Sequence, residues 1–318
     1  MVILDKLDKY IDVFIEIYEK EYEGALPLNI KLESFVPNSA RKTKQRLFVK
    51  FLLDGSAKYI LKLPVSDNDN KVSREYVTLT NLQLGINVAP KPFLLYKNGF
   101  IMSYIDGELV PDLLRVTNNI HKWNFIVDKA IDAIVQLHKK DATPAFNTKE
   151  ILKNFCERIG VKDYIHESIP ESLKLSIGSM HGDLGPWNIV YNRKNDNISL
   201  LDWEDYQPNS IQVMDLINFL FTLPVVMYPE IKNFKELFKN VFLRNGYISE
   251  LICRGLNRYA KQMNISGRDL LFLVPIYCQQ MIYRLEQDNR PSNNYFYGYF
   301  KEAFSYGEIP WSSKLIKK

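Results

Sequence analysis

The chain has few cysteines and no long apolar run, and these shortages exclude several classes of protein. Three cysteines occur in 318 residues, too far apart to form a CxxC pair or a metal-ligand spacing: Cys156, Cys253 and Cys278. We therefore predict reduced thiols in a cytoplasmic protein instead of a disulfide framework. Apolar runs stay well below the roughly eighteen residues that a membrane span needs, so no membrane insertion is expected.

An excess of charge of one sign is also missing. The sequence has 41 basic and 37 acidic residues, a net charge of +4, which gives no case for a nucleic-acid or membrane-surface partner. Charged residues between Asp5 and Lys9 interrupt the apolar core that a signal peptide would need. A hydrophobic content of 46% and this length predict a globular protein of two domains, 1–105 and 106–318.

The first domain shows strand patterns around one helix. Four segments alternate or run apolar between turn residues: 47–53, 59–63, 93–96 and 100–104. Asp54-Gly55 between the first two is a hairpin signal. Before the third, Ser73 is predicted to cap a helix that is closed by Gly85. An amphipathic helix is predicted over 4–22.

After Gly107 the apolar spacing becomes mainly helical. Helices are predicted over the following segments: 123–138, 149–160, 210–223, 230–245, 248–262, 268–289 and 293–306. Residues 180–203 alone are predicted to interrupt them, with a loop and two short strands. We predict a hinge near 105–107.

The interrupting segment carries the chemistry. His181-Gly182-Asp183 is followed by Asn188, five residues after the aspartate, and by Asp202, fourteen residues after Asn188. The first aspartate can take a proton from a hydroxyl, while Asn188 and Asp202 can hold magnesium on a nucleotide. Glycine and aspartate are also common in ordinary turns. The spacing to Asn188 and the two strands predicted around it favour a phosphoryl-transfer site.

This HGDxxxxN pattern with its downstream aspartate resembles the aminoglycoside phosphotransferase and choline kinase superfamily. The resemblance implies an α+β, protein-kinase-like bilobal fold, with a small antiparallel β lobe containing one inserted helix and a larger helical lobe. Residues 1–105 would then bind nucleotide, and 106–318 would carry catalysis and the acceptor. Asp183 would be the catalytic base, and His181 would brace its loop through a backbone hydrogen bond.

The family further implies ATP and Mg²⁺ as cofactors. Asn188 and Asp202 would be the metal ligands. Lys62 is the candidate for the lysine on the α- and β-phosphates, with Lys58 as the alternative on the same strand face, and Glu75 is its expected ionic partner. The alternative reading is a surface lysine and a glutamate favoured by the helix dipole.

Nucleotide contacts are also expected at the hinge. Met102 would line the pocket, and backbone groups of Ser103 and Ile105 would bind the adenine edge; the choice of ATP over GTP rests on the family alone. The phosphate-covering loop over 35–44 departs from protein kinases because it has no glycine. It is either a solvated hairpin tip or a phosphate contact made by its basic residues: Arg41, Lys42 and Lys44.

Two acidic residues near the motif leave alternatives open. Glu204 is either a metal-side contact or an exposed charge. The resemblance implies that Asp215 braces the catalytic loop, while an ordinary aspartate at the start of a helix explains it equally well.

The acceptor is expected to be a small molecule. Seven residues separate Asp202 from the helix predicted at Ser210, too few for the peptide platform of a protein kinase. Gly182 replaces the arginine that reads a phosphorylated activation loop. The reaction predicted is transfer to a hydroxyl of a sugar, amino alcohol or aminoglycoside-like acceptor; the alternatives are a choline or ethanolamine kinase specifically, or an inactive nucleotide-binding module. The oligomeric state stays open.

Aromatic and charged residues of the last helices leave the acceptor's identity open. The aromatic group either cages a quaternary ammonium or packs in the core: Tyr283, Tyr295, Phe296, Tyr297, Tyr299 and Phe300. Acidic residues that suit a polycation stand beside arginines that suit an acidic acceptor: Glu204, Asp205, Glu286 and Asp288 against Arg254, Arg258, Arg268, Arg284 and Arg290.

Overall fold

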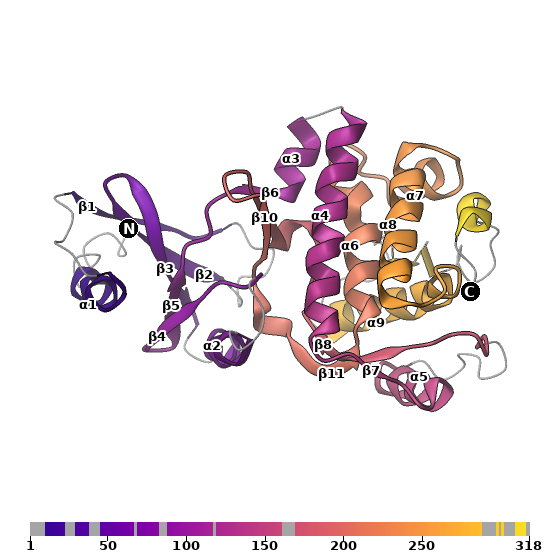
Figure 1. The fold of residues 1–318 in the computed structure, drawn as a ribbon, viewed down its shortest axis with the longest axis horizontal. Helices are drawn as coiled ribbons and strands as arrows, with labels where there is room; N and C mark the ends of the chain where they lie inside the picture. The colour runs from indigo at the N-terminus through magenta and orange to yellow at the C-terminus, as the bar shows by residue number, and fades with distance from the viewer. Residues whose placement is uncertain are drawn as a thin grey trace. The chain divides into compact units, whose positions relative to one another are not determined.

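The computed structural model describes most of the chain in two compact units. The described residues are 10–22, 29–37, 45–66, 69–82, 88–116, 119–160, 169–287, 297–298, 300–301 and 309–315. The first unit contains 1–107 together with 192–194 and 199–205, and the second contains 108–191, 195–198 and 206–318. The segment 199–205, which carries Asp202, therefore groups with the first unit. Figure 1 shows the elements of each unit.

Five described strands form the antiparallel sheet of the first unit, in the order β1-β2-β3-β5-β4. They are β1 (Ile30–Phe35), β2 (Arg46–Leu53), β3 (Ser56–Pro64), β4 (Pro92–Tyr96) and β5 (Gly99–Ser103). The predicted hairpin turn is confirmed, because Asp54 and Gly55 have φ of 48° and 79°, in the left-handed region that Asp and Gly accept most readily. The predicted α+β class, a small antiparallel sheet followed by helices, is confirmed as well.

One face of this sheet packs on α1 (Ile11–Glu21), which lies beside it in Figure 1. Phe14 of the helix stacks on Phe51, with ring centroids 4.9 Å apart, and both side chains are fully buried. Successive residues of a strand point to opposite faces. Arg46, Phe48 and Lys62 therefore lie on the face away from this core.

The inserted helix is α2 (Lys71–Leu82), and it starts before the predicted cap. Ser73 lies inside its first turn, and its hydroxyl donates to the Asn70 carbonyl. The prediction of Ser73 as cap was wrong because Asp69 takes that role: its carboxylate accepts from the Lys71 N–H at 3.0 Å. The end predicted at Gly85, like residues 4–9 of the N-terminal helix, lies outside the described residues.

The second unit is mainly helical. Its described helices of seven or more residues are α3 (Val110–Val116), α4 (Ile120–Lys139), α5 (Thr148–Arg158), α6 (Val213–Met227), α7 (Phe234–Phe242), α8 (Tyr247–Met263) and α9 (Val274–Gln287). Asparagines cap three of them: the side chains of Asn119, Asn147 and Asn233 accept N–H groups of the first turns of α4, α5 and α7. Most of the 293–306 segment lies outside the described residues.

Helix α6 is almost wholly buried and runs beside α4 and α8 (Figure 1). Its Phe221 stacks on Phe242 of α7, and both contact a single buried ring, Phe300. The aromatic residues of the C-terminal segment thus supply core packing at Phe300, as the alternative reading predicted.

Some short strands of the second unit were predicted and others were not. Strand β8 (Ser176–Met180) pairs with β7 (Thr143–Pro144) and with β11 (Gln207–Ile211), and none of these three was predicted. The helix predicted from 210 therefore begins at Val213, because Ser210 and Ile211 belong to β11. In a second group, β6 (Glu108–Leu109) pairs with β9 (Ile189–Asn192), which neighbours β10 (Asn197–Leu200), so the two strands predicted after Asn188 are confirmed.

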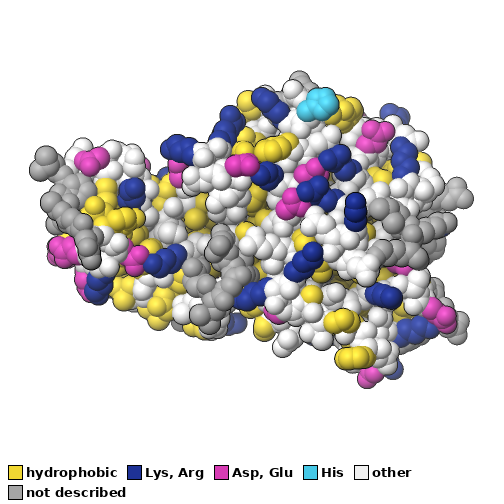
Figure 2. All heavy atoms as spheres, viewed as in Figure 1, with side chains coloured by type: hydrophobic (Ala, Val, Ile, Leu, Met, Phe, Trp, Pro, Cys, Tyr) yellow, Lys and Arg dark blue, Asp and Glu magenta, His cyan; other side chains and the backbone are white. Residues whose placement is uncertain are grey.

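Basic and acidic side chains are interspersed over α4 and α8, as Figure 2 shows. Arg254 and Arg258 of α8 pair with Asp128 and Asp132 of α4; the Arg258 Nη2 lies 2.6 Å from Asp132. These two arginines join the two helices. None of the described helices is both long and apolar enough to cross a membrane.

Candidate active site

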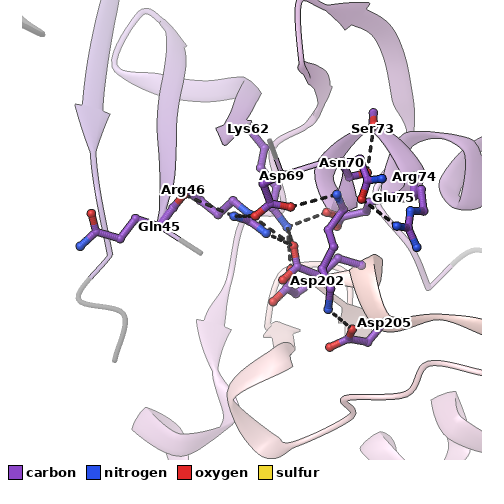
Figure 3. Close-up of polar contacts among 12 residues, drawn as sticks. Gln45, Arg46, Lys62, Asp69, Asn70, Ser73, Arg74, Glu75, Asp202 and Asp205 are labelled. Atoms are coloured by element: carbon purple, nitrogen blue, oxygen red, sulfur yellow. Dashed lines mark hydrogen bonds and ion pairs between the residues drawn. The ribbon is translucent and has the colours of Figure 1, made fainter. Parts of the chain in front are cut away.

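Lys62 is the centre of a polar cluster in the first unit (Figure 3). Its Nζ lies 2.6 Å from Glu75 Oε2 and 2.6 Å from Asp202 Oδ1. A third carboxylate, Glu204, has its Oε2 3.8 Å from the same nitrogen. The Lys62 side chain is only 3% exposed, so these are buried contacts and not the weak ion pairs of a protein surface. The predicted Lys62–Glu75 pair is present.

The alternative lysine does not reach this cluster. Tyr59 pairs with Phe51 and Ala57 pairs with Leu52, so Lys58 is the extra residue of a bulge in β3. The bulge breaks the alternation that put Lys58 and Lys62 on one face. Lys58 is exposed, and the structure places Lys62 among the carboxylates.

The segment Asp202-Trp203-Glu204 is anchored by its tryptophan. Trp203 is fully buried, and its indole N–H donates to the Leu200 carbonyl at 2.8 Å. Its backbone N–H donates to Glu75 Oε1 at 3.0 Å. Glu75 therefore binds Lys62 with one oxygen and the Trp203 backbone with the other, which places the two neighbours of Trp203 at Lys62.

Asp202 adopts a left-handed backbone conformation, with φ of 64°. A side chain at such φ is uncommon and is tolerated best by Asp and Asn. Unfavourable backbone conformations persist where the surroundings hold them, and they gather at functional sites. Here the 2.6 Å contact to Lys62 and the anchored Trp203 hold it.

The electrostatics of the cluster keep Lys62 charged. Burial lowers the pKa of Lys62, but the three surrounding carboxylates outweigh burial, so its pKa lies above the ordinary value. Burial raises the pKa of Glu75, and the positive charge of Lys62 opposes this rise. Lys62 therefore stays protonated, and its contact with Glu75 is an ion pair above the pKa of about 7 to which burial raises Glu75.

The same three carboxylates are suited to hold a cation. Oxygens of Glu75, Asp202 and Glu204 all lie within 4.8 Å of one another. Asp202 is the most accessible of them, with a side chain that is 40% exposed, against 15% for Glu204 and 1% for Glu75. Hard divalent cations prefer carboxylate oxygens. Asp202 is thus the most exposed carboxylate of the cluster, and its role as a metal ligand stays a prediction.

The predicted nucleotide hinge lies at the end of β5. Met102 is 9% exposed and pairs with Ile60 of β3 on the face that carries Lys62. The Ser103 N–H donates to the Lys91 carbonyl at 2.8 Å, so it is already used. The backbone contact of Ser103 with adenine stays a prediction, with the carbonyl as the group that would make it. Ile105 is partly buried, and its contact stays a prediction.

The glycine-free loop is described only at its beginning. Phe35 ends β1 and stacks on Phe48, with ring centroids 5.2 Å apart. Residues 38–44, which include the three predicted basic contacts, lie outside the described residues.

In the second unit, Asp215 organises the His181-Gly182-Asp183 loop. Its carboxylate accepts the backbone N–H of His181 at 2.6 Å and that of Gly182 at 2.9 Å. The bracing role predicted for Asp215 is therefore confirmed. Buried His138 lies behind it, with Nε2 3.5 Å from the same carboxylate and Nδ1 2.8 Å from the Tyr259 hydroxyl.

The backbone conformation of Gly182 explains why glycine occupies this position. Its φ of 86° lies in the left-handed region, where a side chain would be strained. Its N–H is bound by Asp215, and its carbonyl accepts from Arg284 Nη1 of α9 at 2.7 Å. Fully buried His181 accepts the Asp183 N–H at Nδ1, at 3.4 Å, so the predicted backbone brace is present.

Asn188 is fixed through its amide nitrogen. The Nδ2 donates to the Asp183 carbonyl at 2.8 Å, and the residue is 7% exposed. Because the nitrogen is used inside the loop, the amide oxygen is the atom that suits a metal. A side chain at Gly185 would meet the Trp187 ring, with its Cβ 2.2 Å from the nearest ring atom, so this exposed ring would have to move.

Two buried phenols lie near Asp183. Burial raises the pKa of Tyr277 and of Tyr297, and the negative charge of Asp183 adds to both shifts. Their rings are 6.0 Å apart, edge to face, and the Tyr277 hydroxyl donates to Asn218 at 2.6 Å. Within the described part of the aromatic group, Tyr297 is the residue whose pKa responds to the charge of Asp183.

The predicted residues thus form two clusters. The first unit brings together Lys62, Glu75 and Asp202, and the second holds His181, Asp183 and Asn188 in one loop. A metal shared by Asn188 and Asp202 stays a prediction. Sequence reasoning gave no role to three residues that the structure ties to these clusters: Arg46, Asp69 and His138. Arg284, considered only as a cation for an acidic acceptor, binds the Gly182 carbonyl.

A scan against models of known protein families finds no match, and a search of curated proteins finds none either. Among solved structures, the chain is similar to an ethanolamine kinase from Plasmodium vivax, with 16% identity, a TM-score of 0.46 and coverage of 98% of this chain and 90% of that one. It is similar to a choline kinase from Cryptosporidium parvum, with 14% identity, a TM-score of 0.46 and 95% of each chain covered.

A third similar structure is a macrolide 2'-phosphotransferase from Brachybacterium faecium, with 11% identity, a TM-score of 0.49 and coverage of 93% of this chain and 96% of that one.

Replacing Asp215 with Asn should destabilise the second unit by about 1–3 kcal/mol, because one carboxylate oxygen becomes an NH₂ facing a buried backbone N–H. Urea unfolding of the variant and the parent protein measures this. Glu171→Gln, at an exposed position, serves as the matched control and should unfold like the parent. Equal stability of Asp215→Asn and the parent would show that Asp215 does not hold the loop.

Proposed function

We propose that this protein is a magnesium-dependent phosphotransferase that moves the γ-phosphoryl group of ATP to a hydroxyl of a small molecule. The observation that carries the proposal is the buried Lys62 ammonium, held at 2.6 Å by both Glu75 and Asp202. A lysine kept charged in a buried position beside an accessible carboxylate is suited to bind phosphate and a cation at once.

The residues present fit magnesium and ATP. Asp202 offers a hard oxygen donor, with two further carboxylates within 4.8 Å, and Asn188 offers an amide oxygen as the second ligand that the motif indicates. A magnesium ion held by these residues would supply positive charge against the phosphates of ATP. Lys62 would bind the α- and β-phosphates, and Met102 with the Ser103 carbonyl would receive the base.

Asp183 would act as the general base. Its loop is held by Asp215, and its negative charge helps to raise the pKa of two buried phenols, Tyr277 and Tyr297. The role is to orient the acceptor hydroxyl and to take its proton as the oxygen attacks phosphorus. His181 would fix the backbone of this residue.

A small acceptor is favoured by the short segment after Asp202. Trp203–Asp205 forms one 3₁₀ turn, and Gln207–Ile211 is strand β11, paired with β8. These residues are used in regular structure, so they do not form the peptide platform that a protein kinase has in this place. A sugar, amino alcohol or aminoglycoside-like hydroxyl is the acceptor class that we propose.

Replacing Asp183 with Ala should lower turnover by about 10²–10⁴-fold, the usual contribution of a positioned base. ATP affinity should stay near that of the parent, because Lys62 and Asp202 are untouched. Steady-state rates together with calorimetric ATP titration separate the two effects. Asp112→Ala, an exposed aspartate of α3, is the control. Turnover of Asp183→Ala equal to the parent would reject the role.

An ATP-consumption screen over choline, ethanolamine, sugars, nucleosides and aminoglycosides tests the reaction itself. We expect magnesium-dependent consumption with at least one of these alcohols. ATP binding in a thermal-shift assay without transfer to any acceptor would instead favour the inactive nucleotide-binding module. Transfer to protein substrates and to no small alcohol would indicate a protein kinase.

A further inference from the structure

Arg46 is a buried cation of the first unit that the proposed reaction leaves without a role. It begins β2, and its side chain is 8% exposed. Its Nη1 lies 2.7 Å from Asp69 Oδ2, and its Nη2 lies 2.8 Å from Glu204 Oε2 (Figure 3). The Nε donates to the same Glu204 oxygen at 3.3 Å. One guanidinium thus joins the start of β2 to two acidic residues from distant parts of the sequence.

Asp69 anchors the guanidinium. Burial raises the pKa of Asp69. The Lys71 N–H and the charge of Arg46 lower it by more than burial raises it, so the pKa of Asp69 lies below the ordinary value. Asp69 is therefore ionised at neutral pH, and it holds Nη1 while the other two nitrogens face Glu204.

Glu204 is placed between two cations, and Arg46 holds it more closely. The Glu204 Oε2 lies 2.8 Å from Arg46 but 3.8 Å from Lys62 Nζ, which is too long for a hydrogen bond. An ammonium group has three N–H donors. Glu75 and Asp202 accept two of those of Lys62.

Removing Arg46 changes the balance of charge. With Arg46, two cations face the three carboxylates that lie within 4.8 Å of one another; without it, Lys62 alone faces all three. The Glu204 side chain is only 15% exposed, so leaving its carboxylate charged without Arg46 costs much free energy. Contact with Lys62 is the nearest remedy, and it would use the third N–H of the ammonium.

We propose that Arg46 is a positioning residue of the nucleotide site: by binding Glu204, it keeps that carboxylate off Lys62 and leaves one ammonium donor for a nucleotide phosphate. This inference rests on the proposed function. Arg46 acts through Glu204 and Lys62 and does not itself touch the nucleotide.

Calorimetric titration of ATP, with and without Mg²⁺, tests the inference. Arg46→Met should weaken ATP binding by about tenfold or more, because Glu204 then competes with phosphate for a charged donor. Adding Glu204→Gln removes the competitor. The double variant Arg46→Met/Glu204→Gln should therefore bind ATP within about threefold of Glu204→Gln alone.

Two further variants complete the design. Arg46→Lys keeps the positive charge and should lose less affinity than Arg46→Met. Arg74→Met removes an exposed arginine of α2 that binds Asn70, and it should bind ATP like the parent. Circular dichroism melts establish that each variant is folded. Should Arg46→Met fail to fold, Arg46→Lys with and without Glu204→Gln carries the same comparison.

Two outcomes overturn the inference. Parental affinity in Arg46→Met would show that Arg46 does not affect the site. A loss that Glu204→Gln does not restore would show that Arg46 binds nucleotide directly or supports the fold alone. If the parent protein binds no ATP, the proposed function fails and the inference falls with it, an outcome distinct from both.

Discussion

The ion pairs of the Lys62 ammonium are the interaction on which the first unit depends. A buried lysine without partners loses its proton, since burial disfavours the charged form. Glu75 and Asp202, each 2.6 Å away, keep it charged. These contacts join β3, α2 and the segment 199–205. That segment packs with the first unit, although it comes after Asp183 and Asn188 of the second unit in the sequence. The same contacts therefore keep Lys62 charged, hold three segments of the first unit together and place the ammonium that we propose binds phosphate.

The second unit depends on a different device. The Asp215 carboxylate accepts two backbone N–H groups, so it shapes the loop through its main chain. Gly182 supplies the left-handed turn, and Asn188 closes the loop on the Asp183 carbonyl. The loop is thereby preorganised, which is what a positioned base and a metal ligand require.

Much of the candidate site could be predicted because its signals are local. The spacing of Asp183 and Asn188 is written in one loop, and the place of Lys62 follows from one strand before one helix. Contacts between distant segments gave no such signal. Arg46 meets partners 23 and 158 residues away. Strand β11 depends on pairing with β8, which no local pattern reveals, and the Ser73 cap was wrong because Asp69, two residues before α2, does the capping.

A crystal structure of the protein with Mg²⁺ and a non-hydrolysable ATP analogue tests the central claim most directly. The account predicts a phosphate oxygen within hydrogen-bond distance of Lys62 Nζ and a divalent ion ligated by the Asp202 carboxylate. A nucleotide bound away from Lys62, or an ion that Asp202 does not ligate, would contradict it.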